Sequence, residues 1–203
     1  ADACAAAGLT HGRVFFADFE QTLFPRSALG SPRTEGASRY TAGRVGAALD
    51  LSGELFRVPP IKNIQPAEGT VAFWYRPGKA LAEAEGDVEL FLGTDHIRLR
   101  WYAKQRTLQY MTGTTIEGQG FRWQYAGYAE ARAWPEGEWR HLALTWNAGS
   151  GEKAFWVDGR RVLSVKTELI NRSYTGNKLM LVGDALFPCA VDELMSWGRV
   201  LGD

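Results

Sequence analysis

The chain has 203 residues, of which 45% are hydrophobic and 23% are charged, a composition that supports a folded core and excludes a disordered tail. Its 23 Lys and Arg residues balance its 23 Asp and Glu residues, and this neutrality argues against nucleic acid as the main partner, because phosphate binding requires a basic face. Since no apolar run approaches the length of about 18 residues that a membrane span requires, we expect no span in this sequence.

Short stretches with two-residue periodicity follow one another along the chain and predict β-strands. We expect residues 1–12 to form a tail or linker and residues 13–203 to form one domain, as sandwiches of about 200 residues commonly do. Residues 21–42 are long and irregular, and their role stays open. The strands are expected at residues 14–20, 47–51, 55–58, 70–76, 88–92, 97–102, 107–112, 121–125, 140–146, 153–157, 161–166, 179–182 and 190–197. No helical period lasts ten residues, so the fold class is all-β.

Turn residues support a two-sheet antiparallel sandwich. Asp158-Gly159 lies between two strand-like runs, and this pair favours a type I′ hairpin because both of its residues must adopt positive φ. Residues 79–86 are expected to form one helical turn or a polar loop, and residues 112–133 a long connection of the functional kind. Most of the eight Trp residues are expected in the core between the sheets.

Four segments, in order, resemble those of laminin G-like domains with the concanavalin A-like jelly roll. They are G-A-A-L-D-L at 46–51, E-G-T-V-A-F-W-Y-R-P at 68–77, W-P-E-G-E-W-R-H-L-A-L-T-W at 134–146 with F-W-V-D-G at 155–159, and A-V-D-E-L-M-S-W at 190–197 with R-V-L at 199–201. The resemblance covers about residues 14–201. It implies the fold, and it implies function much less, because one fold hosts many activities.

The two cysteines, Cys4 and Cys189, are too far apart in sequence for a metal knuckle. They either form a disulfide that staples the termini, which would imply an oxidising compartment, or remain free thiols. In the family that the chain resembles, the first and last strands are neighbours, which would bring Cys4 within reach of Cys189. We therefore expect a disulfide and an extracellular, periplasmic or cell-surface location.

The same resemblance suggests a calcium ion where the terminal strands meet. Some relatives hold a structural Ca²⁺ there with a side-chain carboxylate and backbone carbonyls, the oxygen ligands that a hard cation needs. Asp18 and Asp192 are the obvious contributors in this sequence. Two solvated or capping carboxylates are the alternative.

One motif suggests catalysis. Glu85, Asp87 and Glu89 match the E-x-D-x-E pattern of endo-glycanases that share the jelly roll. On a strand, alternate residues point to one face, so two of these carboxylates could act as nucleophile and acid/base of a retaining hydrolase. Against this, residues 80–86 have the pattern of a loop, and the surrounding segments resemble the non-catalytic relatives.

A binding surface is predicted on the strand at residues 97–102. Alternation buries Ile97, Leu99 and Trp101 and turns the intervening side chains outward. The predicted carbohydrate-binding residues are Arg98, Arg100, Tyr102, Arg122, Trp123 and Tyr125. Aromatic rings suit the apolar face of a pyranose, and the excess of Arg (17) over Lys (6) leans towards anionic glycans. An ordinary solvent-exposed sheet face is the alternative.

These observations predict a non-catalytic carbohydrate-binding or adhesion module of a secreted or cell-surface protein. Its partner would be a polysaccharide or glycoconjugate, and the module would belong to a larger chain, such as an enzyme that degrades polysaccharide. The first alternative is a retaining endo-glycanase built on Glu85, Asp87 and Glu89. The second is a structural or protein-binding module without a sugar site.

Overall fold

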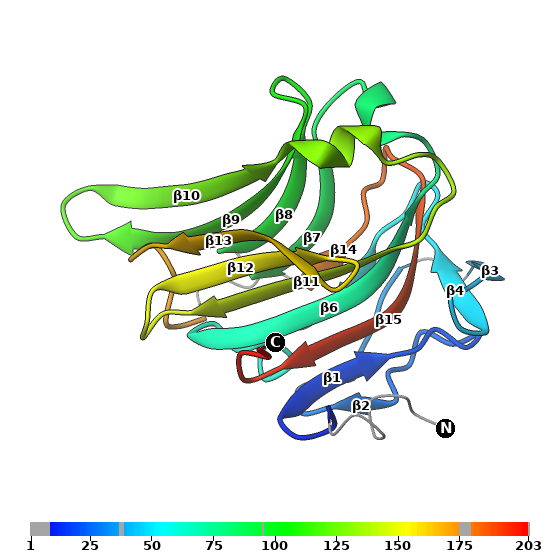
Figure 1. Ribbon diagram of the computed structural model, residues 1–203. Helices are drawn as coiled ribbons and strands as arrows, with labels where there is room; N and C mark the ends of the chain where they lie inside the picture. Colours follow the sequence, from blue (N-terminus) through cyan, green and yellow to red (C-terminus); the bar gives the residue numbers. More distant parts are fainter. Residues whose placement is uncertain (1–8, 37–38, 95, 175–179, 203) are drawn as a thin grey trace.

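The structure, a computed structural model, describes residues 9–36, 39–94, 96–174 and 180–202. Two antiparallel sheets pack face to face as a sandwich (Figure 1). The nine-stranded sheet has the order β13 (Arg160–Lys166), β12 (Glu152–Val157), β11 (Arg140–Asn147), β6 (Glu68–Pro77), β15 (Cys189–Trp197), β1 (Arg13–Ala17) and β2 (Ser27–Ala28), with β4 (Ala47–Asp50) beside β15 and β3 (Arg39–Ala42) beside β4. The six-stranded sheet has the order β10 (Gly120–Tyr128), β9 (Thr107–Ile116), β8 (Ile97–Tyr102), β7 (Val88–Thr94), β14 (Met180–Val182) and β5 (Phe56–Val58).

Alternating side chains from both sheets form the core. On β6, Val71, Phe73 and Tyr75 are fully buried between the sheets. On β8, Ile97, Leu99 and Trp101 are buried as the alternation predicts. Because every second residue of these strands faces inward, the intervening residues remain on the two outer faces, where a binding site can form.

All thirteen predicted strands are present, and the all-β jelly roll is confirmed. Asp158 and Gly159 adopt φ values of 50° and 76° in the hairpin between β12 and β13, as the type I′ prediction requires. The stretch at residues 79–86 contains a single 3₁₀ turn, η1 (Leu81–Glu83).

Two expectations about irregular segments are wrong. Residues 112–133 are not a long connection, because β9 extends to Ile116 and pairs with β10 along its length, and η2 (Ala129–Ala133) follows. The β-branched residues at 114–116 extend the first strand, and Gly118 and Gly120 supply the positive φ values of its turn. Likewise, the irregular segment 21–42 contains β2 and β3.

Hydrogen bonds fasten the segments before β1 and after β15 to the nine-stranded sheet. The indole Nε1 of Trp197 donates to the carbonyl of Leu9 (2.6 Å), and Arg199 Nε donates to the carbonyl of His11 (3.1 Å). Cys189 is buried and forms no disulfide with any described residue, and burial raises the pKa of its thiol to about 12. Its expected disulfide partner, Cys4, lies outside the described residues, so that pairing is not observed and stays a prediction.

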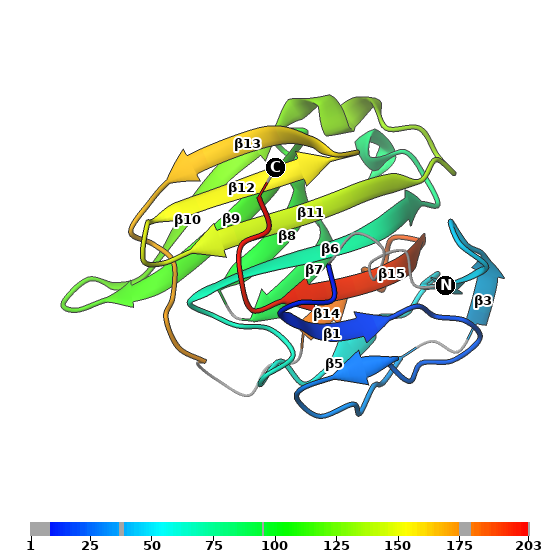
Figure 2. The same ribbon diagram turned by 60° about the horizontal axis from the view of Figure 1, so that its bottom comes forward.

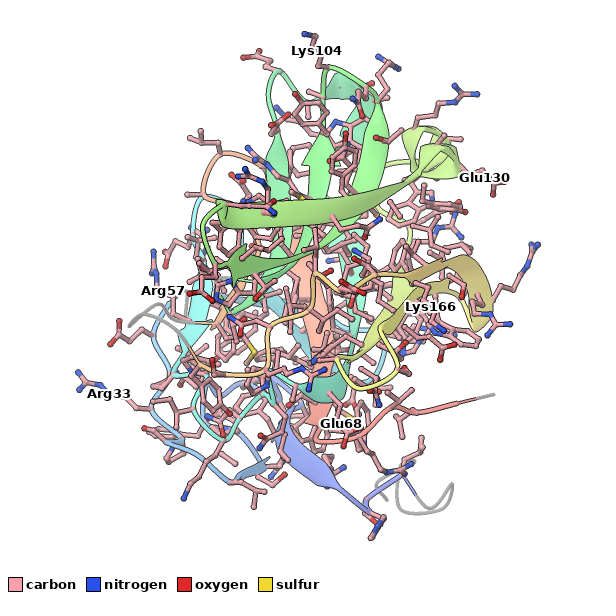
Figure 3. The ribbon with its side chains drawn as sticks, turned by 90° about the vertical axis from the view of Figure 1, so that its left-hand side faces the viewer. Arg33, Arg57, Glu68, Lys104, Glu130 and Lys166 are labelled. Atoms are coloured by element: carbon pink, nitrogen blue, oxygen red, sulfur yellow. The ribbon has the colours of Figure 1, made fainter. Side chains whose placement is uncertain are left out.

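A buried lysine joins the two sheets. Lys153 of β12 is only 2% exposed, and its Nζ donates to the carbonyls of Tyr110 on β9 (3.1 Å) and Gln124 on β10 (3.0 Å). The ammonium also lies 4.6 Å from the centre of the Tyr110 ring. Burial lowers the pKa of Lys153 to about 7, because the charged form loses its hydration. By contrast, Lys104 and Glu130 project away from the molecule (Figure 3).

No helix in the described parts of the chain is long and apolar enough to cross a membrane.

Candidate functional site

The outer face of the six-stranded sheet carries the predicted residues of β8. Arg98, Arg100 and Tyr102 alternate with the buried core residues of that strand and are each half-buried. Strand β7 lies on one side of β8, and β9 and then β10 on the other. The neighbouring strands therefore decide what these three side chains contact.

Both arginines are held by carboxylates from β7 and the residue before it. Arg98 Nε lies 2.9 Å from Glu89 Oε2, and Arg100 Nη2 lies 2.9 Å from Asp87 Oδ2. Asp87 also accepts a hydrogen bond from the backbone N–H of Ala103 (2.9 Å), which fixes its orientation. In the sequence these two carboxylates belong to the E-x-D-x-E motif that suggested catalysis, and that motif did not reveal them as partners of the arginines.

Aromatic side chains of β10 continue the surface beside Arg98. The guanidinium carbon of Arg98 lies 5.6 Å from the centre of the Trp123 ring, and Trp123 meets Phe121 edge to face at 4.9 Å. His96 stacks on Phe121 at 5.1 Å. Tyr125 lies on the same face of β10 as Trp123, two residues further on, and is 54% exposed. Trp123, Tyr125 and Phe121 thus form an aromatic row along the edge of the sheet.

A glycine on β9 makes room for this row. Gly113 pairs with Trp123, and a Cβ at position 113 would lie 2.5 Å from the Phe121 ring. The structure does not bring Arg122 into the surface, because strand alternation places it on the opposite face of β10 from Trp123. Five of the six predicted binding residues therefore share one face.

Glu89 is the most perturbed acid on this face. Burial raises its pKa to about 7, and this effect outweighs the attraction of Arg98 and Arg100, which lowers the pKa. Its second oxygen, Oε1, is buried and has no hydrogen-bond partner among the described residues. Glu89 thus offers an unused oxygen next to a guanidinium and an aromatic ring.

The three acids of the proposed catalytic motif, Glu85, Asp87 and Glu89, lie in different environments. Glu85 is exposed in a bend before β7, whereas Asp87 and Glu89 lie on the outer face, each paired with an arginine. A retaining hydrolase needs two free carboxyl groups that face each other across the scissile bond. Asp87 and Glu89 share a face, whereas Glu85 lies in the exposed bend before them.

The two residues predicted to bind calcium have different environments. Asp18 is neutralised by an ion pair with Arg26. Asp192 is fully buried, and its Oδ2 accepts hydrogen bonds from the backbone N–H groups of Arg44 (2.8 Å) and Val45 (3.0 Å). Burial raises the pKa of Asp192, and the nearby Glu20 carboxylate raises it further.

Of the two predicted calcium ligands, only Asp192 has a carboxylate oxygen that suits a cation. The Oδ1 of Asp192 is buried without a hydrogen-bond partner in the described chain, so it could accept a cation together with backbone carbonyls. Asp18 does not fit, because Arg26 already compensates its charge. Among the described residues, no group of three or more His, Cys, Asp or Glu side chains could hold a metal ion. The calcium site stays a prediction.

Comparison with known proteins identifies the family. The family model of the concanavalin A-like lectin/glucanases superfamily, of laminin G type, matches residues 52–203, and the chain belongs to this superfamily. No curated protein sequence matches the chain.

Several solved structures share the fold. One is the ligand-binding domain of botulinum neurotoxin serotype D in complex with N-acetylneuraminic acid (TM-score 0.73, 12% identity, 98% of this chain and 50% of that chain). Another is a botulinum neurotoxin type C structure, described with cell entry that depends on two ganglioside molecules (TM-score 0.71, 11% identity, 97% and 50%). The chain thus spans about half the length of these structures, and at such low identity the similarity shows the fold alone.

Proposed function

We propose that this chain is a non-catalytic carbohydrate-binding module whose binding site is the outer face of the six-stranded sheet. The observation that carries the proposal is the position of Arg98, between the Glu89 carboxylate at 2.9 Å and the Trp123 ring at 5.6 Å. This places fixed hydrogen-bonding groups beside an aromatic platform. Sugars need both, because a pyranose has an apolar C–H face and a rim of hydroxyl groups.

The polar groups of this face are already oriented before a ligand arrives. The ion pairs of Arg98 and Arg100 fix four side chains, so a sugar hydroxyl can bind with little further loss of conformational entropy. Because both guanidiniums have a carboxylate partner, the face favours hydroxyl groups over a second anion. We therefore expect neutral glycans to bind at least as well as anionic ones.

The wider context is part of the same proposal. The two toxin structures were described with N-acetylneuraminic acid and with gangliosides, which supports a glycoconjugate as the kind of partner. The module would act outside the cytoplasm or at the cell surface, as a domain of an adhesion protein or an accessory domain of an enzyme that degrades polysaccharide. A location in which disulfides form would suit the predicted pairing of Cys4 with Cys189.

Affinity electrophoresis through gels that contain neutral or acidic polysaccharides tests the site. We expect retardation of the unmodified protein by at least one polymer, and loss of retardation in Trp123→Ala and Tyr125→Ala. Phe24→Ala is the matched control, because Phe24 is 72% exposed and lies far from this face in the loop before β2. Retardation that survives both site variants would place the site elsewhere. No retardation in any gel would favour a structural or protein-binding module.

One observation keeps a second function worth testing. The pKa of Glu89, raised to about 7, suits a general acid, which must stay protonated near neutral pH. A retaining endo-glycanase that uses Glu85, Asp87 and Glu89 would release reducing sugar from the polymer that retards the protein. Release that disappears in Glu89→Gln, while the variant keeps its fold, would support hydrolysis. No release by the unmodified protein would leave the binding module.

A further inference from the structure

A second groove lies on the outer face of the nine-stranded sheet, away from the proposed sugar site. It has a volume of about 630 Å³ and is lined mainly by apolar atoms. Its floor crosses four neighbouring strands, because Met195 of β15 pairs with Ala72 of β6, Ala72 with Ala143 of β11, and Ala143 with Trp156 of β12. At the usual strand spacing this floor is roughly 14 Å long.

Larger groups on both sides turn this row of small residues into a trough. Trp74 and His141 pair across β6 and β11 with ring centres 5.1 Å apart and form one wall. The segment after β15 forms the other wall, where Thr70 Oγ1 accepts a hydrogen bond from the N–H of Leu201 (2.9 Å) and donates one to the carbonyl of Arg199 (2.9 Å). Figure 2 shows this segment running across the outer face of the sheet over β6, β11 and β12. Both walls are therefore fixed by contacts within the fold.

Positive charge flanks the trough. The Arg44 guanidinium lies 5.0 Å from the centre of the Trp74 ring, and that of Arg161 lies 5.5 Å from the Trp156 ring. Neither arginine is paired with a carboxylate in the part of the chain that the structure describes. The indole Nε1 of Trp156 is also buried there without a hydrogen-bond partner. Glu193 lines the end of the trough at β15, where Arg44 also lies, and it is the one acidic residue among the described residues that line the trough. The Trp156 Nε1 and the Arg161 guanidinium lie at the opposite end, on β12 and β13, away from that carboxylate.

We propose that this trough binds an amphipathic anion with an aliphatic body and a carboxylate head. The body lies along Met195, Ala72 and Ala143, where it removes apolar surface from water. The head lies at Trp156 and Arg161, where the indole donor has no hydrogen-bond partner and the guanidinium has no carboxylate partner among the described residues. A polar sugar fits this trough less well than it fits the opposite face, because the floor offers it few hydrogen-bonding groups. The proposal does not depend on the sugar site, since the two surfaces lie on different sheets.

Decanoate is the probe, with decyltrimethylammonium as the probe that has the same tail and the opposite charge. Both are titrated below micelle formation, and binding is followed by calorimetry and by Trp fluorescence. We expect saturable binding of decanoate at one site and at least tenfold weaker binding of the ammonium probe. Equal binding of the two probes, or no saturation with decanoate, would overturn the proposal.

Two variants locate the probe in the trough. Arg161→Gln removes the cation from an exposed side chain and is expected to weaken decanoate binding five- to tenfold without affecting the ammonium probe. Arg160→Gln is the matched control, because Arg160 acts electrostatically on Tyr128 of the other sheet. Ala143→Leu fills the floor and is expected to weaken decanoate binding at least tenfold, with circular dichroism to confirm the fold. Unchanged decanoate affinity in Arg161→Gln would refute the assignment of the head group, even if Ala143→Leu failed to fold.

Discussion

Replacement of Lys153 by Met tests how the buried lysine that connects the two sheets contributes to stability. In the native protein the Lys153 Nζ donates to the carbonyls of Tyr110 and Gln124, and no carboxylate of the described residues forms an ion pair with it. Burial holds its pKa at about 7, whereas the unfolded chain has the ordinary value of about 10.5. Between these values the unfolded state binds a proton that the folded state does not.

The sign and size of the effect follow from this difference. The free energy of unfolding of the native protein should rise with pH from about 7 to about 10.5, by about 1.4 kcal/mol per pH unit relative to Lys153→Met. Below pH 7 the lysine is protonated in both states, and the difference between the two proteins should be constant. The two lost hydrogen bonds of the variant add an offset that does not depend on pH, and titrations of other groups cancel in the comparison.

Urea unfolding of both proteins at pH 7.5 and 9.5 measures the effect, which should be about 3 kcal/mol over this interval. Lys104→Met is the matched control for the loss of a lysine, because Lys104 is exposed at the turn between β8 and β9. A flat difference curve for Lys153→Met would refute the reasoning, because it would show that Lys153 titrates in the folded protein as it does in the unfolded chain.

Three further predictions concern other buried polar groups. The free energy of unfolding of the native protein, relative to that of Glu89→Gln, should fall by about 3 kcal/mol as the pH rises from 4.5 to 7, because folding raises the pKa of Glu89 and the folded state retains the proton. Urea unfolding at pH 4.5 and 7 measures this difference, and a rise in it would contradict the prediction. Asn63→Ala should lower the free energy of unfolding by roughly 2–4 kcal/mol, because the fully buried Asn63 side chain makes three hydrogen bonds to backbone groups of neighbouring loops. If urea unfolding shows no loss beyond experimental error, these hydrogen bonds contribute nothing to stability. Calcium should raise the melting temperature of the native protein and not that of Asp192→Asn, and a melting temperature that chelator leaves unchanged would rule out the calcium site.

The strands were predictable because their signal is local. In residues 97–102 each core residue alternates with an outward one, and burial of Ile97, Leu99 and Trp101 follows from that pattern alone. The same pattern correctly placed Arg98 and Arg100 on the outer face. It also shows why Arg122 does not belong with Trp123, since neighbouring residues of a strand point to opposite faces.

The contacts of those residues depend on register, which the sequence does not display. Glu89 pairs in the backbone with Arg100, yet its carboxylate contacts Arg98, because irregular pairing between β7 and β8 shifts the side chains diagonally. A loop-like pattern before β7 concealed the position of Asp87 as the partner of Arg100. Such pairs form between strands, and a motif defined within one strand cannot reveal them.

The trough was missed for a related reason. Its floor takes one residue from each of four strands, and those residues span positions 72 to 195. We expected most tryptophans in the core, but Trp74 lies between the inward-facing Phe73 and Tyr75 and must therefore face outward. Size favours burial of tryptophan, whereas the position on the strand decides which side of the sheet it covers.

The two outer faces of this sandwich differ in chemistry although the same alternation produces both. One face carries ion pairs beside aromatic rings, as at Arg98 and Trp123. The other has an apolar trough flanked by guanidiniums that have no carboxylate partner among the described residues, such as that of Arg161. A sandwich that needed only stability would cover both faces with solvated polar residues, since its core lies between the sheets. Substitutions at Trp123 and Arg161 remove side chains from opposite faces and leave that core intact. The first should therefore remove glycan retention and the second should weaken anion binding, each without affecting the other site and with little effect on unfolding, as expected when one scaffold carries two separate sites.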